Sequence, residues 1–296
     1  MPLFVSVEPA AVCQLRCPEC PVGQASDVSA LPKNHGFPGT PLMNRDVWER
    51  VLRETARHAH TMQFYFQGEP LLNRDLPQMI AEAHAEGLYT IVSTNAQALT
   101  AEMAEQLVRA GLDRIIVSMD GLTQESYGAY RIGGNLDRCK DALRFLHEAK
   151  KRLHGRTTVE LQCLRLRTNE HEWPRFRREY KALGADRLTF KTAQLHDYAD
   201  GHPLMPTDGR YNRYTQGPDG RYRRKPLRRG CWRVWSGVVV STTGEVLPCC
   251  YDKAHEHAYG NILETPLAEL FRSDKANAFR ASALQEKPLI CKECWR

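Results

Sequence analysis

The sequence predicts an α/β fold: an open, partial (β/α)6 barrel followed by a small domain built around cysteines. Short apolar segments alternate with amphipathic helical ones through the first 200 residues. Eight of the ten cysteines fall into two groups, one near each end of the chain. The 296 residues suffice for one barrel-sized domain and an appendage. We expect a barrel over 1–205, a basic connecting segment over 206–230 and the cysteine-rich domain over 231–296.

The predicted strands are short segments rich in β-branched and aromatic residues. They comprise residues 3–9, 61–68, 88–95, 113–120, 157–166 and 186–191. Strands that alternate with helices pair in parallel and are joined by crossover helices. Because a closed barrel of this kind needs eight units, we expect this one to remain open.

The predicted helices place apolar residues three and four positions apart. They comprise residues 43–59, 76–87, 100–111 and 135–153. Asn44, Thr100 and Asn135 are expected to cap the helices that follow them, because their side-chain oxygens can accept first-turn N–H groups. Gly87 and Gly111 are expected to end two of them.

The composition is that of a globular protein, with 26% charged and 42% hydrophobic residues. No apolar run is long enough to cross a membrane, and the start of the chain lacks the basic and apolar regions of a secretory signal. We therefore expect a cytoplasmic protein with no membrane partner. A reducing cytosol favours metal binding over disulfides for clustered cysteines. The separate Cys139 and Cys163 are expected to be buried as small hydrophobic residues.

Much of the net charge of +6 lies in residues 209–230, where arginines alternate with tyrosines, glycines and prolines. Such a stretch can bind phosphates and stack on bases. No nucleic-acid recognition module surrounds it, so we interpret it as a solvated connection between domains and expect no nucleic-acid partner.

The first cysteine group, "VCQLRCPECPVG", places Cys13, Cys17 and Cys20 in a C-x3-C-x2-C pattern. Thiolates are soft ligands that suit iron–sulfur clusters and zinc. Three of them leave one iron of a four-iron cluster open to another ligand. A catalytic zinc site also keeps an open position and is the main alternative.

Polar residues follow the first four predicted strands: the cysteines, then "QGEP" at 67–70, "STN" at 93–95 and "SMDG" at 118–121. In parallel α/β folds, binding and chemistry gather at the carboxyl ends of the strands. The sequence therefore predicts a single site at this end of the barrel.

C-x3-C-x2-C after a first strand, with "QGEP" one unit later, resembles the radical S-adenosylmethionine (SAM) superfamily over most of the chain. The resemblance implies a [4Fe–4S] cluster on Cys13, Cys17 and Cys20 whose fourth iron chelates S-adenosylmethionine. It implies reductive cleavage of that molecule to a 5′-deoxyadenosyl radical, which takes a hydrogen atom from the substrate. It also implies a reducing partner such as flavodoxin or ferredoxin.

Further positions are assigned to S-adenosylmethionine by the same resemblance: Gly68, Glu69, Ser93, Asn95, Ser118 and Arg131. Gly68 and Glu69 are implied to approach the methionine amino group, and Arg131 the carboxylate. The serines and the asparagine are implied to contact the ribose or the methionine end. Ordinary turn chemistry is the alternative explanation for them. Gln67 departs from the family pattern, which usually has glycine there.

The second cysteine group comprises Cys231, Cys249, Cys250, Cys291 and Cys294. The stretch "VVVSTTGEVLP" predicts a hairpin with its turn near Gly244, which would bring Cys231 close to the adjacent pair. This region resembles the SPASM/twitch extension of the superfamily, which implies a second, auxiliary [4Fe–4S] cluster. A structural zinc ribbon is the alternative.

Five cysteines leave one thiol over when four bind a cluster. Adjacent residues on a strand point to opposite sides, so Cys249 and Cys250 are not expected to bind the same cluster. A free thiol can donate a hydrogen atom to a carbon radical. The "PCC" pair resembles the aminoglycoside-tailoring enzymes, the neomycin epimerase type in particular. That resemblance implies Cys249 as the donor and Cys250 as a ligand together with Cys231, Cys291 and Cys294. The Gly244-x4-Cys249 spacing favours the opposite assignment, with Cys249 as the ligand.

The function expected from these resemblances is a radical SAM epimerase that inverts a carbon stereocentre of an aminoglycoside, of the neomycin C to neomycin B type. The first strand begins at about residue 3, with no module before it to hold a leader peptide, which favours a small substrate. The alternatives are a twitch-type dehydrogenase of an aminocyclitol and a peptide-modifying radical SAM/SPASM enzyme. From a different class, a zinc-containing RNA-binding protein would use the arginine-rich stretch.

Overall fold

The computed structural model of the chain describes residues 1–24, 41–225, 231–285 and 288–294. The last five residues of the basic segment, 226–230, and the last two of the chain lie outside the described residues. Among the described residues, no helix combines the length and the apolar character needed to span a bilayer.

Six parallel strands form the barrel wall and confirm the predicted fold class. They are β1 (Phe4–Val7), β2 (Thr61–Phe64), β3 (Tyr89–Thr94), β4 (Arg114–Ser118), β5 (Thr158–Arg165) and β6 (Arg187–Thr192). Each pairs in parallel with the next. All six agree with the predicted segments to within a few residues. β6 ends the sheet on one side, so the barrel is partial.

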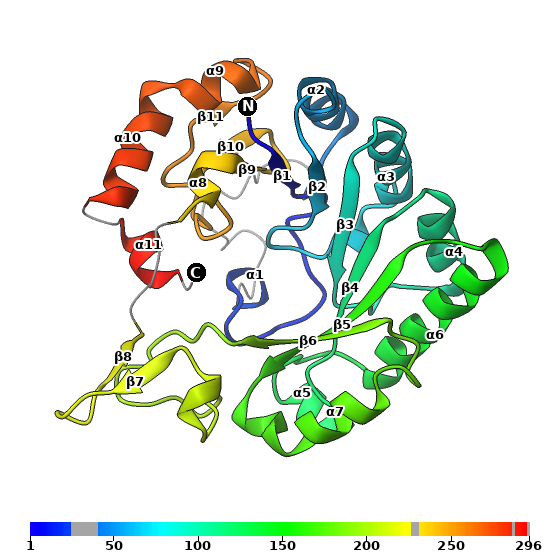
Figure 1. The fold of residues 1–296 in the computed structure, drawn as a ribbon, viewed down its shortest axis with the longest axis vertical. Helices are drawn as coiled ribbons and strands as arrows, with labels where there is room; N and C mark the ends of the chain where they lie inside the picture. Colours follow the sequence, from blue (N-terminus) through cyan, green and yellow to red (C-terminus); the bar gives the residue numbers. More distant parts are fainter. Residues whose placement is uncertain (25–40, 226–230, 286–287, 295–296) are drawn as a thin grey trace.

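The long predicted helices are present and lie along the outside of the sheet (Figure 1). They are α2 (Arg45–Thr55), α3 (Leu76–Ala85), α4 (Ala101–Arg109) and α6 (Leu136–Leu153). Asn44 and Thr100 accept first-turn N–H groups at 2.9 and 3.1 Å, and Asn135 does so at 2.8 Å. Gly87 and Gly111 follow α3 and α4 with φ of 79° and 78°, which glycine adopts readily.

Shorter helices were not predicted, because each offers too few turns for a periodic pattern. In the barrel they are α1 (Pro21–Gln24), α5 (Gln124–Gly128) and α7 (Trp173–Glu179), with 3-10 turns η2 (Pro70–Leu72) and η3 (Arg167–Glu172).

The main hydrophobic core lies between the outer face of the strands and the helices. Val5 and Val7 of β1 and Phe64 of β2 belong to it, and Phe64 packs on Trp48 of α2 with ring centroids 5.6 Å apart. Cys139 and Cys163 are fully buried there, as expected. Strand side chains alternate between faces, so the inner face carries the other set. That set is largely polar, including Ser6, Gln63, Ser93, Ser118 and Gln162.

The cysteine-rich region extends the barrel sheet at its first edge. β9 (Gly237–Val240) pairs in parallel with β1, β10 (Glu245–Leu247) pairs antiparallel with β9, and β11 (Gly260–Asn261) pairs with β10. The predicted hairpin is confirmed, with Gly244 in its turn at a φ of 90°. Four helices accompany these strands: α8 (Arg233–Ser236), α9 (Leu267–Arg272), α10 (Asp274–Leu284) and α11 (Leu289–Glu293).

The described part of the basic segment is folded and is more than a solvated connection. It contains the 3-10 turn η4 (Gly209–Tyr211) and a hairpin of β7 (Tyr214–Gln216) and β8 (Tyr222–Arg224). Arg213 donates to the Thr192 carbonyl at 3.0 Å and to the Tyr251 hydroxyl at 2.9 Å. Arg224 donates to the Lys292 carbonyl at 2.6 Å. These arginines hold the open barrel edge against the cysteine-rich region.

Candidate active site

The first cysteine group lies on the loop between β1 and α1, within the arc of strands (Figure 1). Cys17 is buried in a second hydrophobic cluster with Leu15 and Tyr130, and Cys13 and Cys20 pack against that cluster. The loop is joined to the end of β2 by a hydrogen bond from Glu69 N to the Val12 carbonyl at 2.8 Å. The predicted residues of the first two strand ends therefore meet.

Gly68 allows this close approach of two backbone segments. A Cβ at this position would lie 2.1 Å from the Ala10 carbonyl oxygen and 2.7 Å from both N and O of Val12. Glycine is therefore required for packing against the cysteine loop. Its implied contact with S-adenosylmethionine stays a proposal.

The Glu69 carboxylate is 2% exposed and joins the second strand end to the third. It accepts hydrogen bonds from Thr94 Oγ1 at 2.6 Å and from Asn95 N at 2.8 Å. Burial raises the pKa of Glu69, and these donors oppose the shift. The carboxylate is thus committed to protein donors, which the sequence pattern did not indicate.

Asn95 contacts a cysteine directly. Its Nδ2 lies 3.3 Å from Cys13 Sγ, and Leu15 N donates to the same sulfur at 3.4 Å. Gln14, which the sequence did not single out, orients Asn95 through a 3.2 Å hydrogen bond to its Oδ1. N–H groups directed at sulfur are the interactions that tune iron–sulfur clusters.

Arg131 lies beside a second cysteine of the same loop. Its Nε donates to Asp120 Oδ2 at 2.6 Å, and its Nη1 is 3.8 Å from Cys17 Sγ. Asp120 is fully buried and also accepts from Leu164 N at 2.6 Å. One side of the guanidinium is therefore occupied, which leaves fewer donors for the implied methionine carboxylate.

Ser93 and Ser118 stand on the inner face at the ends of β3 and β4. Within the described residues, neither hydroxyl makes a hydrogen bond that fixes it. Ser118 pairs in register with Gln162, whose Oε1 is buried and has no described partner. These groups are placed to bind a polar ligand, and their implied contact with the cofactor stays a proposal.

The thiols of Cys13 and Cys17 are protonated when no metal is bound. Burial raises the pKa of Cys13 to about 11, and it also raises that of Cys17. Metal binding must therefore displace these protons.

The second cysteine group gathers residues from three parts of the chain. Cys231 precedes α8, Cys249 and Cys250 follow β10, and Cys291 and Cys294 lie in and after α11. Burial raises the pKa of Cys249, and the neighbouring Cys250, Cys294 and Cys291 raise it further. The turn and the terminal helix are therefore close enough for their thiols to interact.

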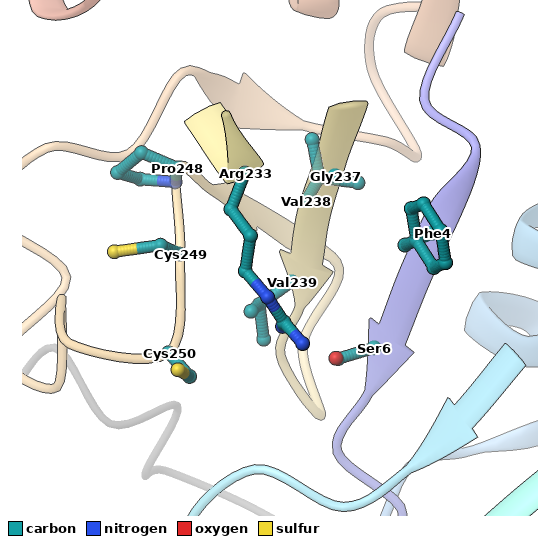
Figure 2. Close-up of a pocket in the computed structure, with 9 residues that line it drawn as sticks. All are labelled: Phe4, Ser6, Arg233, Gly237, Val238, Val239, Pro248, Cys249 and Cys250. Carbon is teal, nitrogen blue, oxygen red and sulfur yellow. The ribbon is translucent and has the colours of Figure 1, made fainter. Parts of the chain in front are cut away.

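Strand alternation does not separate Cys249 from Cys250, contrary to the prediction from the sequence. β10 ends at Leu247, so both cysteines lie in the bend and turn beyond it and strand alternation does not apply. Their thiols nevertheless point in different directions (Figure 2).

The donors present fit iron–sulfur clusters. Each group supplies at least three soft thiols, and Asn95, Leu15 and Arg131 direct N–H groups at the first. In the part of the chain that the structure describes, no three Cys, His, Asp or Glu side chains are gathered as they would be around a single metal ion.

Two sequence families match separate parts of the chain. Residues 7–188 match the Radical SAM superfamily, and residues 231–295 match SPASM, an iron–sulfur cluster-binding domain. The first match covers most of the barrel and the second covers the cysteine-rich region.

Curated relatives match over nearly the whole chain. A PqqA peptide cyclase from Rhodopseudomonas palustris is 28% identical over 331 residues, covering 99% of this chain and 79% of its own. A tungsten-containing aldehyde ferredoxin oxidoreductase cofactor-modifying protein from Pyrococcus furiosus is 22% identical, covering 98% and 86%.

Solved structures share the fold. Streptococcus suis SuiB superimposes with a TM-score of 0.70 at 15% identity, covering 95% of this chain and 68% of its own. BtrN in complex with AdoMet and 2-DOIA superimposes with a TM-score of 0.59 at 19% identity, covering 99% of this chain and 93% of its own.

Proposed function

The chain belongs to the radical SAM superfamily, and we propose that it is a peptide-modifying enzyme of the branch that carries a SPASM domain. Its cofactors are [4Fe–4S] clusters and S-adenosylmethionine. The observation that carries the choice of substrate is the match to PqqA peptide cyclases, which extends over 99% of this chain.

Cys13, Cys17 and Cys20 would hold the cluster that acts on S-adenosylmethionine. When bound there, the two cofactors supply a 5′-deoxyadenosyl radical, which removes a hydrogen atom from the substrate. Asn95 and Arg131 would donate to two of the three thiolates. The Ser93 and Ser118 hydroxyls and the Gly68 backbone would contact S-adenosylmethionine from the inner face of the barrel.

The charges near this site support a peptide over an aminoglycoside. A polycationic aminoglycoside needs carboxylates that are free to bind ammonium groups. Glu69 and Asp120, which lie at the ends of β2 and β4, are buried and already accept hydrogen bonds from the protein. Glu8, which follows β1, is also buried. The nearby basic segment would repel such a substrate further.

Epimerisation is the second candidate, and the surplus cysteine favours it. With Cys231, Cys250, Cys291 and Cys294 as ligands of the auxiliary cluster, Cys249 keeps its S–H. That thiol would give a hydrogen atom to the substrate carbon radical on the opposite face, and one electron and one proton from an external reductant would then restore it. An aminoglycoside epimerase of the neomycin type and a peptide epimerase would share this step.

The test uses protein reconstituted anaerobically with iron and sulfide and supplied with dithionite and S-adenosylmethionine. It is incubated in deuterium oxide with a library of synthetic peptides or with a panel of aminoglycosides that includes neomycin C. We expect peptides to accelerate release of 5′-deoxyadenosine and to change in mass. Acceleration by aminoglycosides alone would contradict the peptide proposal, and a ketone product would identify an aminocyclitol dehydrogenase.

Two matched variants test the role of the thiol. Cys249→Ala should retain all the iron and lose solvent deuterium from the product, whereas Cys250→Ala should lose the auxiliary cluster. The opposite result reverses the assignment of the pair. If both variants still introduce deuterium at an inverted carbon, neither thiol is the donor.

A further inference from the structure

A small cavity separates β1 from the turn that carries Cys249 and Cys250 (Figure 2). Its volume is about 20 Å³, and Ser6, Arg233 and both cysteines contribute to its wall. A water molecule needs at least about 10–15 Å³ of such space. The cavity therefore has room for a solvent molecule and none for a substrate.

Among the described residues that line this cavity, Arg233 is the only charged one. α8 begins with it, two residues after Cys231. Its side chain extends between Ser6 of β1 and the turn with Cys250 (Figure 2). Its Nε is buried with no hydrogen-bond partner, and no carboxylate among the described residues forms an ion pair with the guanidinium.

The arginine beside the first cysteine group is in a different electrostatic state. Asp120 pairs with Arg131 at 2.6 Å and compensates its charge before any cofactor is considered. Among the described residues, no carboxylate compensates the charge of Arg233 in this way. A partly buried charge without a counter-charge costs free energy, so an anion is expected beside it. The cysteine sulfurs are the wall groups that become anionic, because thiols bind iron as thiolates.

We propose that Arg233 is a positioning residue for the auxiliary cluster, acting through the Cys249–Cys250 turn. Its guanidinium donates to the thiolate of this pair that binds iron. Its positive charge stabilises the reduced, more negative cluster and raises its reduction potential. Net charge and hydrogen bonds to sulfur are two of the factors that set such potentials. The inference rests on the auxiliary cluster of the proposed function.

The experiment isolates this cluster by replacing Cys13, Cys17 and Cys20 with alanine in the full chain. After anaerobic reconstitution, iron content shows whether the auxiliary cluster is present. A dithionite titration followed by electron paramagnetic resonance gives its midpoint potential. Arg233→Gln and Arg233→Lys are compared with Arg272→Gln, which removes the same charge from an exposed position on α9.

We expect Arg233→Gln to keep its iron and to have a more negative midpoint potential, and Arg233→Lys and Arg272→Gln to remain close to the parent. Equal potentials in the two glutamine variants would overturn the proposal. Loss of iron in Arg233→Gln alone would support a requirement for the charge. Loss of iron in both Arg233 variants would show that the arginine side chain is needed for packing and would overturn the role proposed for its charge. If the proposed function is wrong about the auxiliary cluster, the parent protein will not bind the iron of that cluster. If only the role of Arg233 is wrong, the iron will be present and the midpoint potential will not change in Arg233→Gln.

Discussion

Replacing Gly68 with alanine tests whether the glycine is needed to seat the cysteine loop. The new Cβ would lie 2.1 Å from the Ala10 carbonyl oxygen, whereas real contacts of this kind essentially never fall below 3.0 Å. The backbone must therefore separate by about 0.9 Å. Overpacking typically costs about 1–3 kcal/mol. We expect a loss near 3 kcal/mol, because the three closest atoms belong to the backbone and cannot rotate away.

Urea unfolding of the metal-free protein measures this loss. Gly209→Ala is the matched control, because no atom lies within 4 Å of the Cβ it would add. Displacement of the loop should also lower iron incorporation at the first cysteine group. If Gly68→Ala unfolds at the same urea concentration as Gly209→Ala and takes up as much iron, the steric reasoning is wrong.

The other predictions concern buried charges. Burial raises the pKa of Glu8 to about 7, above that of an unfolded carboxyl, so ionisation favours unfolding. The free energy of unfolding of the wild type should fall by up to about 3 kcal/mol as pH rises from 4.5 to 7 and then level off, and Glu8→Gln should remove this fall. Urea unfolding at several pH values measures it. The same pH dependence in the wild type and in Glu8→Gln would contradict the prediction. Arg131→Met leaves the buried Asp120 without its cation and should lower the free energy of unfolding by about 3–5 kcal/mol. Adding Asp120→Asn to this variant should restore part of the loss. An unchanged urea midpoint in Arg131→Met would show that the ion pair does not stabilise the protein.

Local patterns were sufficient to predict the barrel. The six strands and the long helices follow from alternation, apolar spacing and caps such as Asn44 and Asn135. The parallel pairing of β9 with β1 could not be predicted, because it joins residues more than 200 positions apart and has no local signal. The role of Arg213 was missed for the same reason, since its partners Thr192 and Tyr251 come from distant segments.

The candidate site was predicted as a set of residues, but their roles were not. Spacing correctly places the first cysteine group, Glu69 and Asn95 at one end of the barrel. It could not reveal that Glu69 bonds to Thr94, because hydrogen-bond partners depend on side-chain direction. The sequence likewise predicts a strand through Cys249 and Cys250, because "VVV" and "EVL" on either side of Gly244 give no sign of where strand pairing ends.

Release of 5′-deoxyadenosine tests the central claim most directly, namely that Cys13, Cys17 and Cys20 hold a cluster that acts on S-adenosylmethionine. Protein reconstituted with iron and sulfide should release it under dithionite, and the protein with these three cysteines replaced by alanine should not, although its auxiliary cluster remains. A fully iron-loaded wild type that leaves S-adenosylmethionine intact, or a triple variant that still cleaves it, would contradict the account.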